Sequence, residues 1–345
     1  MTTPSDSLLP AAHASDKTAP WPAYVTASLA WHAGAGLFAI AAPASWPWAV
    51  AAIAANHAVL TAGGLWPRSR WLGSNWTRLP AHAANRREIA ITIDDGPDPA
   101  VTPAVLDLLD AHGAKATFFC IGAEARAHPA LCREIVGRGH SVQNHSDRHS
   151  HRFSLLGPKA MAREIAAAQA SLADITGEAP RFFRAPAGLR NPFLAPVLQR
   201  LDLQLVSWTR RGFDTVRREP SDVLARLARS LAGGDILTVH DGNAARTKDG
   251  TAVLLAVLPG LLAHARSLGL VAVTLPAASL QPGRATSRAP ASPGARREQP
   301  RGRPWRAPRC RRGRARCRRP PGRARDAPAR RWARAARCRS RAESS

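Results

Sequence analysis

The chain has few cysteines, and its N-terminal part contains a long stretch without charge. Five of the 345 residues are Cys, and three of these lie in the C-terminal tail without Cys-x-x-Cys spacing. A zinc site in the tail is therefore not expected. Cys120 and Cys132 fall on a predicted strand and the helix after it, and we interpret them as buried thiols. Cysteine usage therefore does not indicate the compartment.

The C-terminal tail lacks the side chains needed for a core. Residues 281–345 contain almost no large aliphatic residues but hold 22 Arg and only three acids, which accounts for +19 of the net charge of +25. Such a segment cannot bury enough apolar surface to offset its ordering entropy, so we expect disorder over 277–345. Arginine also suits nucleic acid. Because no nucleic-acid motif is present, an incidental tail is favoured over a nucleic-acid-binding arm.

Residues 23–65 contain no Lys, Arg, Asp or Glu. This region divides into two apolar stretches, each about long enough to cross a bilayer, and Trp46, Trp48, Trp66 and Trp71 suit its interfaces. We predict a transmembrane helical hairpin over 23–66. The alternative is a hairpin packed on the catalytic domain or lying in the interface. A secretory signal peptide fits poorly, since no basic segment leads into the first stretch.

The regions around the hairpin complete its interpretation. Residues 1–22 are expected to be disordered and 67–87 to form a linker. Five arginines follow the second stretch and the intervening loop carries no charge, so the positive-inside rule favours a cytoplasmic catalytic domain on a bacterial-type inner membrane. A periplasmic domain is the alternative. The basic residues that decide the orientation are Arg68, Arg70, Arg78, Arg86 and Arg87.

From residue 88 to 276, short apolar runs alternate with helical patterns. Repeated strand–helix alternation indicates βαβ units and a parallel sheet. Seven units in this length favour a small barrel, complete or incomplete, over an open doubly wound sheet. The residues that could take part in catalysis fall at the carboxyl ends of strands, where barrel active sites lie. Strands are expected at 88–93, 116–121, 141–144, 181–184, 204–208, 235–239 and 271–275, and helices at 103–111, 124–138, 159–176, 222–232 and 251–267.

Two pairs of residues in this body suggest a metal site. Asp94 and Asp95 follow an apolar strand. Adjacent carboxylates repel each other unless a cation is bound, in which case one can ligate it while the other stays free as a base. His145 and His149 are four residues apart, so on a helical turn both imidazoles would face one metal. One carboxylate and two imidazoles leave positions open for water and substrate. Zinc suits this set best, although Co²⁺, Ni²⁺ or Fe²⁺ would also bind. His151 is a competing ligand.

Four ordered segments resemble the motifs of one family. The chain is similar to the polysaccharide deacetylases, the NodB-homology group of carbohydrate esterase family 4, over about residues 88–276. The resemblance implies an α/β fold, a distorted (β/α)7–8 barrel of NodB-homology type, in an enzyme that removes acetyl groups from sugars. The segments that carry the resemblance are Thr92-Ile-Asp-Asp-Gly96, His145-Ser-Asp-Arg-His149, Arg184-Ala-Pro-Ala-Gly188 and Leu237-Thr-Val-His-Asp241.

The resemblance also implies roles for single residues. Asp94 would be the general base, His240 the general acid, and Arg184 would orient Asp94. The implied metal ligands are Asp95, His145 and His149. In the fourth motif, which usually has Trp followed by two aspartates, this chain keeps only Asp214, which would tune a histidine or hold Arg184.

Two departures bear on the substrate. Arg211 stands at the first aspartate position of the fourth motif, and with Arg210 it implies an anionic substrate neighbourhood. Ala187 stands where an aromatic residue is common, which removes one wall of a glycan groove. We therefore expect a metal-dependent hydrolase acting on an acylated amino-sugar glycan or a lipid-linked sugar. The alternatives are an inactive glycan-binding relic and, from the tail, a nucleic-acid-binding protein.

Overall fold

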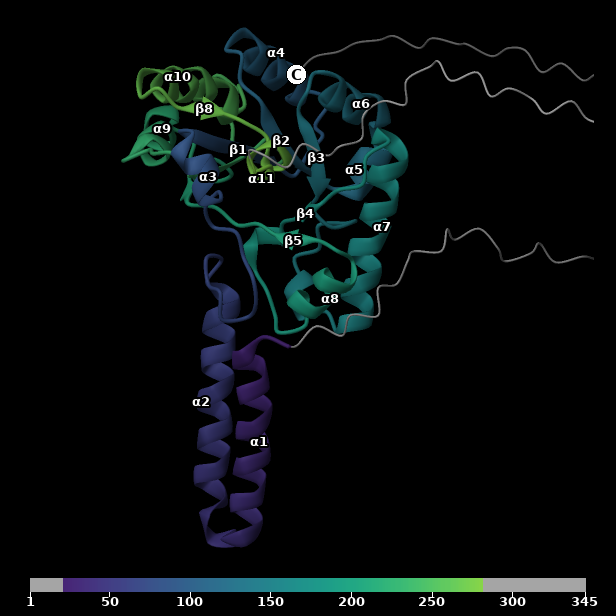
Figure 1. Cartoon of the computed structure of the whole chain (residues 1–345), viewed down its shortest axis with the longest axis vertical. Coiled ribbons are helices and arrows are strands. Elements are labelled where there is room, and N and C mark those ends of the chain that lie inside the picture. Colours follow the sequence, from purple (N-terminus) through teal and green to yellow (C-terminus); the bar gives the residue numbers. More distant parts are fainter. Residues whose placement is uncertain (1–20, 282–345) are drawn as a thin grey trace, which may run out of the picture. The chain divides into compact units, whose positions relative to one another are not determined.

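The computed structural model describes residues 21–281, and the predictions for 1–20 and 282–345 lie outside this range. An N-terminal helical hairpin is followed by an α/β body (Figure 1). The helices are α1 (Ala23–Ala41), α2 (Trp46–Leu65), α3 (Ala81–Asn85), α4 (Thr102–Ala111), α5 (Gly122–Ala127), α6 (Pro129–Gly137), α7 (Pro158–Thr176), α8 (Leu194–Arg200), α9 (Pro220–Ala228), α10 (Val253–Ser267) and α11 (Leu275–Ser279).

The body is built on one parallel sheet with the order β5-β4-β3-β2-β1-β7-β6, and β8 pairs with β1 beside this path. All pairs are parallel, as the alternation of strands and helices predicted. The strands are β1 (Glu88–Asp94), β2 (Ala116–Cys120), β3 (Ser141–Asn144), β4 (Phe182–Phe183), β5 (Gln204–Leu205), β6 (Arg210–Arg211), β7 (Ile236–His240) and β8 (Val271–Ala272).

The sheet curls into a distorted half-barrel, which confirms the predicted fold class. β5 and β6 lie at opposite ends of the strand order, yet only residues 206–209 connect them, so the two edges must approach each other. Trp76 bridges to Val206 beside β5, and Arg78 bridges to Asp235 beside β7. The segment expected to be a linker thus fills the gap between the edges of the sheet.

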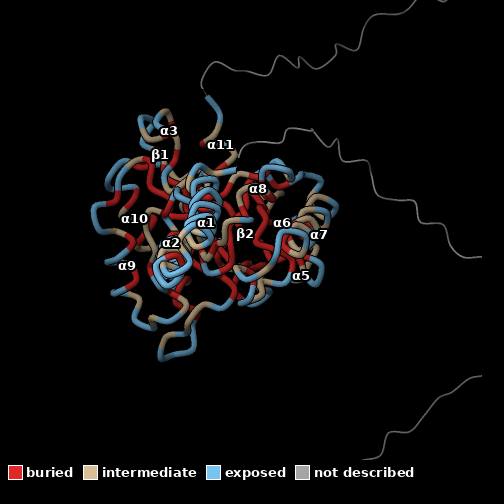
Figure 2. The backbone as a smooth tube through the Cα atoms, turned by 90° about the horizontal axis from the view of Figure 1, so that it is seen from below, coloured by how far each residue is buried: buried red, intermediate tan, exposed pale blue. Residues whose placement is uncertain are grey.

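Apolar strands covered on both faces form the core. β1 buries Ile89, Ile91 and Ile93 completely, as expected for a parallel strand between helices. Each such side chain contributes about 2 kcal/mol of burial free energy. Figure 2 shows the strands of the body as buried, whereas α1 and α2 are mostly exposed. The expected thiols, Cys120 and Cys132, are buried and free.

Three local features differ from the predicted elements. The helix expected over 124–138 is divided into α5 and α6 at His128, because proline disfavours helical geometry in the residue before it. β6 and α8 were not predicted, since each is short and carries little periodic signal. Ala278 of α11 packs with the core, so ordered structure extends past the expected boundary at 276.

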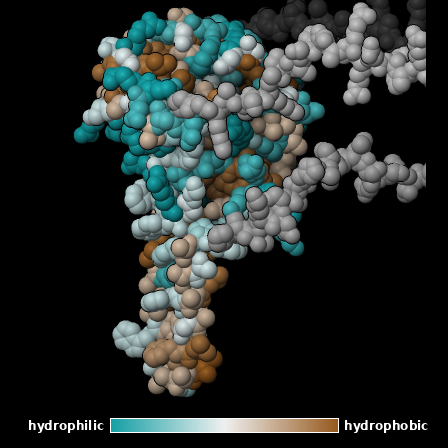
Figure 3. All heavy atoms as spheres, in the orientation of Figure 1, coloured by the Kyte–Doolittle hydropathy of each residue, from teal (hydrophilic) through white to brown (hydrophobic). Residues whose placement is uncertain are grey.

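The hairpin helices run side by side and expose most of their apolar surface (Figures 1 and 3). Both are long and apolar enough to cross a membrane, and only 11% and 17% of the respective windows are buried. Most of the hairpin therefore does not pack against the body within residues 21–281. Between the helices, Asn56 donates a hydrogen bond to Ser28 at 2.6 Å, and the Nε2 atoms of His32 and His57 lie 3.2 Å apart.

Candidate active site

The candidate residues meet at the carboxyl ends of four parallel strands. Asp94 is the last residue of β1, and its backbone is in register with His240, the last residue of β7. His145 and Arg184 follow β3 and β4 directly. Because parallel strands end at the same edge of a sheet, residues from four distant segments come together there.

Asp95, His145 and His149 form a compact triangle of ligand atoms. Oδ1 of Asp95 lies 3.1 Å from Nε2 of His145 and 3.2 Å from Nε2 of His149. The ligand atoms of all three residues lie within 4.8 Å of one another. The helical turn predicted for the two histidines is wrong. His145 and His149 lie in the loop after β3, where Ser146 and His149 have positive φ, and this loop brings the rings together.

The neighbours of the triangle orient its side chains. The Nδ1–H of His145 donates to the carbonyl oxygen of Arg184 at 2.8 Å, so its Nε2 is the ring nitrogen turned toward Asp95. Burial lowers the pKa of His149 to about 4, which keeps that ring neutral. Burial alone would raise the pKa of Asp95, but the adjacent histidines, His145 above all, lower it overall. A carboxylate with two imidazoles is a donor set that fits a divalent cation.

Arg184 is the largest fully buried side chain and holds Asp94. Its Nη1 donates to Oδ1 of Asp94 at 2.6 Å and to Oγ1 of Thr92 at 2.6 Å, and Nη2 donates to the carbonyl of Ser207. Burial lowers the pKa of Arg184, and the Asp94 carboxylate opposes that shift. No hydrogen bond within residues 21–281 reaches Oδ2 of Asp94, so this oxygen remains available at the pocket.

His240 is held by Asp214. Its Nδ1–H donates to Oδ1 of Asp214 at 2.9 Å, and its backbone N–H donates to Oδ2 at 2.7 Å. Burial alone would lower the pKa of His240, but the Asp214 carboxylate outweighs it and the pKa is raised. Of the two possibilities for Asp214, tuning a histidine or holding Arg184, the structure shows the contact with the histidine. The side chain of His240 therefore presents Nε2 for proton exchange.

Two residues to which the sequence assigned no role support the site. Asn243 donates to Oδ2 of Asp95 at 3.3 Å, and its only signal in the sequence is its place just after the last motif. Asp241 is fully buried and burial raises its pKa to about 7, although a hydrogen bond from Thr102 opposes the shift. A Cβ on Gly96 would lie 2.4 Å from the Asp241 carboxylate, so the turn after β1 requires glycine there.

A cavity of about 450 Å³ opens over these residues. Its rim includes Trp208 and Arg211, together with His151, the competing ligand, which lies beside His149 with the ring centroids 6.5 Å apart. Of the two arginines expected near the site, only Arg211 lines the cavity. Arg210 pairs with Asp235 at 2.6 Å instead, because alternate residues of a strand point to opposite faces.

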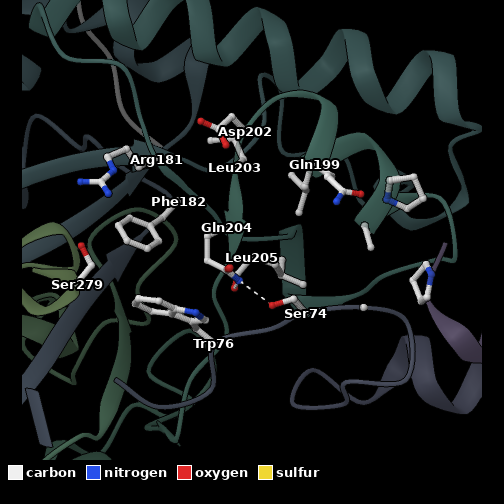
Figure 4. A pocket seen from close by; sticks show the side chains of 15 residues that line it. Ser74, Trp76, Arg181, Phe182, Gln199, Asp202, Leu203, Gln204, Leu205 and Ser279 are labelled. Carbon is white, nitrogen blue, oxygen red and sulfur yellow. Dashed lines mark hydrogen bonds between the residues drawn. The ribbon is translucent and has the colours of Figure 1, made fainter. Parts of the chain in front are cut away.

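A second, larger cavity of about 580 Å³ lies near the amino ends of β4 and β5. Trp76 and Phe182 form one side of it, and Gln204 donates a hydrogen bond to Ser74 across it (Figure 4). None of the residues predicted for catalysis lines this cavity. Asp94, His240 and the three candidate ligands line the smaller cavity at the opposite strand ends instead.

A parallel half-barrel with acidic and imidazole side chains at its strand ends is the arrangement of a metal-dependent hydrolase. The polysaccharide deacetylase family model matches residues 81–206. A chitooligosaccharide deacetylase of Azorhizobium caulinodans is 35% identical over 159 residues, which cover 46% of this chain and 75% of that protein. The chain therefore belongs to the polysaccharide deacetylase family, and the expected class, a hydrolase of carbon–nitrogen bonds other than peptide bonds, is confirmed.

Two other relatives extend the comparison. A peptidoglycan-N-acetylglucosamine deacetylase of Bacillus cereus is 32% identical over 179 residues, which cover 51% of this chain and 83% of that protein. A family pseudoenzyme of Bacillus anthracis has a similar structure, with a TM-score of 0.53 and 20% identity, covering 59% of this chain and 68% of its own. Since a pseudoenzyme shares this fold, the fold alone does not establish turnover, and the side chains must carry that argument.

Proposed function

We propose that the chain removes N-acyl groups from an acylated amino-sugar glycan by metal-assisted hydrolysis. The observation that carries this proposal is the Asp95, His145 and His149 triangle lying beside both Asp94 and His240 in one cavity. An inactive glycan-binding relic would have no reason to keep this complete set. A nucleic-acid-binding function depends on residues outside the described range.

The triangle would hold the cation. Zn²⁺ suits this donor set best, and Co²⁺, Ni²⁺ or Fe²⁺ would also bind. A divalent ion bound there supplies Lewis acidity, which polarises the acyl carbonyl and makes water more acidic. Asp95 presents Oδ1 to both imidazoles, while Asn243 occupies its other oxygen. These contacts orient the carboxylate toward the position that the two imidazoles share.

The remaining side chains divide the proton transfers. Asp94, held by Arg184, takes the proton from water through its free Oδ2 as the water oxygen bonds to the acyl carbon. His240 then gives the proton on Nε2 to the amine nitrogen as the carbon–nitrogen bond breaks. Its Nδ1–H remains bonded to Asp214, which stabilises the protonated ring before the transfer. Acetate and a free amino sugar are the products.

The two relatives are named as deacetylases of chitooligosaccharides and of peptidoglycan N-acetylglucosamine. These names support an N-acetylated amino sugar as the substrate of this chain. Two departures from the family's usual motifs line the cavity: Ala187 stands where an aromatic residue is common, and Arg211 stands at an aspartate position. Both changes favour a short or anionic substrate over a long neutral polymer.

The test is acetate release by the full chain from chitotetraose, peptidoglycan fragments and lipid-phosphate sugars. We expect EDTA to lower the rate at least about 100-fold, because the bound ion supplies most of the activation of water. Added Zn²⁺ should restore the rate. Unchanged release in EDTA would contradict metal assistance. A folded, metal-free protein without activity would support the glycan-binding alternative.

We propose in addition that the hairpin anchors the protein in a bilayer. α2 has 20 residues, which corresponds to a length of about 30 Å, the thickness of a hydrocarbon core. Side chains that would need burial in a soluble protein are exposed, among them Leu37 and Ile40 at 67% and 77%. The positive-inside rule favours a cytoplasmic catalytic body on an inner membrane, with a periplasmic body as the alternative.

Replacing Leu29 with lysine tests the anchor. Leu29 is 61% exposed near the middle of α1, and a lysine at the centre of a spanning helix costs about 3 kcal/mol of insertion free energy. The fraction that resists carbonate extraction should therefore fall, whereas Leu29→Ile should keep it. A reporter fused after residue 80 reports the side of the body. Equal extraction of both variants would contradict a spanning hairpin.

A further inference from the structure

The base of the hairpin carries a group of aromatic side chains, which we call the basal aromatic belt. One member comes from the body, so the body itself reaches this level. The Phe193 ring lies 6.4 Å from that of Trp21, and the Trp71 ring lies 6.2 Å from that of Tyr24. Aromatic residues gather where a bilayer meets water. The belt consists of Trp21, Tyr24, Trp66, Trp71 and Phe193.

Arg190 joins the hairpin to the loop after β4. Its backbone N–H donates to the carbonyl of Gly64 at 3.1 Å, and its Nη2 donates to the carbonyls of Ser69 at 2.8 Å and Trp66 at 3.2 Å. Burial lowers the pKa of Arg190 to about 10, so the side chain stays charged near neutral pH. The carboxyl end of a helix attracts a cation, which adds to these hydrogen bonds.

The wall of the catalytic cavity is built on the same base. Gly188 and Trp208 line the cavity, and a Cβ on Gly188 would lie 3.0 Å from the Pro67 ring just after α2. Pro67 accepts a hydrogen bond from Ser207 Oγ at 2.6 Å. Arg184 in turn donates to the carbonyl of Ser207 and to Asp94. Ser207 and Arg184 therefore connect the hairpin to Asp94, the candidate general base. The cavity therefore lies next to the level at which the belt places the membrane surface.

Arg211 lies on the cavity rim without a carboxylate partner among residues 21–281. Its Nε is buried and has no hydrogen-bond partner within residues 21–281, and no ion pair in that range includes its guanidinium. The guanidinium instead lies 5.2 Å from the ring of Trp208 and 5.1 Å from that of Phe213. Arg148, 81% exposed, lines the same cavity. A guanidinium held in this way suits a phosphate oxygen.

We propose that the substrate is an N-acylated amino sugar joined through a phosphate to a lipid of the bilayer that holds the hairpin. The cavity receives the sugar at the membrane surface and Arg211 binds the phosphate. Arg190 holds the loop after β4, which lines the cavity, against the base of the hairpin. This inference rests on the proposed deacylase function and on the hairpin as an anchor.

The first experiment compares presentations of one sugar. Full-length, Zn²⁺-loaded protein in vesicles is given polyprenyl-phosphate N-acetylglucosamine in the same bilayer, the same lipid in separate vesicles, or soluble chitotetraose. We expect release from the shared bilayer to be at least about tenfold faster than from either alternative, because confinement raises the effective concentration.

The second experiment tests the phosphate contact. Arg211→Met keeps the apolar stem against Trp208 and should raise KM for the lipid-phosphate sugar about tenfold, the value of one charge-assisted hydrogen bond. Arg226→Met is the matched control, since Arg226 also lies over Phe213 at 5.7 Å but does not line the cavity. Thermal unfolding of both variants establishes that the fold is kept.

The results distinguish failure of the lipid-linked substrate from failure of the deacylase function. Turnover of chitotetraose that equals or exceeds that of the lipid-phosphate sugar would leave the deacylase function standing and overturn the lipid-linked substrate. Equal KM changes in Arg211→Met and Arg226→Met would do the same. Loss of release from every substrate in a folded, metal-loaded protein would overturn both.

Discussion

Asp94→Asn should lower kcat by about a thousandfold while the protein still binds one metal ion per chain, because a positioned general base contributes a factor of this order. The asparagine can still accept the hydrogen bond from Arg184 through its carbonyl oxygen, so the local geometry is largely kept. It cannot take a proton from water. Asp94 also lies outside the ligand triangle, so metal content should not change.

The matched control is Asp98→Asn in the same loop. Asp98 accepts hydrogen bonds from the backbone N–H groups of Ala100 and Val101, and the carbonyl oxygen of an asparagine can accept the same bonds. Asp98 does not line the cavity. Single-turnover acetate release and metal analysis should be measured together with thermal unfolding. Some loss of stability is expected in Asp94→Asn, since the buried Arg184 loses its charged partner. Loss of metal from Asp94→Asn would mean that the two adjacent aspartates are assigned in reverse.

His145→Ala should lower metal affinity by at least about 100-fold and remove activity with it. Loss of an outer hydrogen-bond partner of a ligand already costs about ten- to 100-fold, and here a ligand atom itself is lost. His145 is also almost fully buried and supplies the Nε2 nearest to Asp95. Metal content after dialysis against a weak chelator provides the measurement, and added Zn²⁺ at high concentration should restore little of the rate.

His151→Ala provides the comparison for His145→Ala. His151 lines the cavity beside His149 but is not part of the ligand triangle, so metal affinity should change less than about threefold, a free-energy difference below 1 kcal/mol. If His151→Ala loses metal and His145→Ala keeps it, the ligand set proposed for this chain is wrong. Equal losses in both variants would indicate a fourth protein ligand.

The sequence was informative about the site because the chemistry lies in short, ordered segments at strand ends. Asp94 and Asp95 follow a continuous apolar run, so the place where the strand ends could be predicted along with the residues themselves. The spacing of His145 and His149 was interpreted through helical geometry, and that reason failed. The loop after β3 brings the two rings together through left-handed backbone conformations that side-chain patterns do not predict.

Long-range contacts were less accessible. Nothing local to Arg190 distinguishes it from a surface arginine. The fold nevertheless buries it at the carboxyl end of α2, where its Nη2 donates to the carbonyl of Ser69, 121 residues earlier in the chain. Arg210 and Arg211 are adjacent and chemically equal in the sequence. The pleat of β6 sends one to Asp235 and the other to the cavity.

By itself the sequence determined the strand–helix alternation, the uncharged hairpin and the identity of the candidate ligands, because these depend on periodicity, composition and residue type. Only the tertiary structure decided which side chains share a cavity, that Asp214 bonds His240 rather than Arg184, and that the hairpin base supports the cavity wall. These depend on the curl of the sheet, which brings residues from distant segments within hydrogen-bond distance.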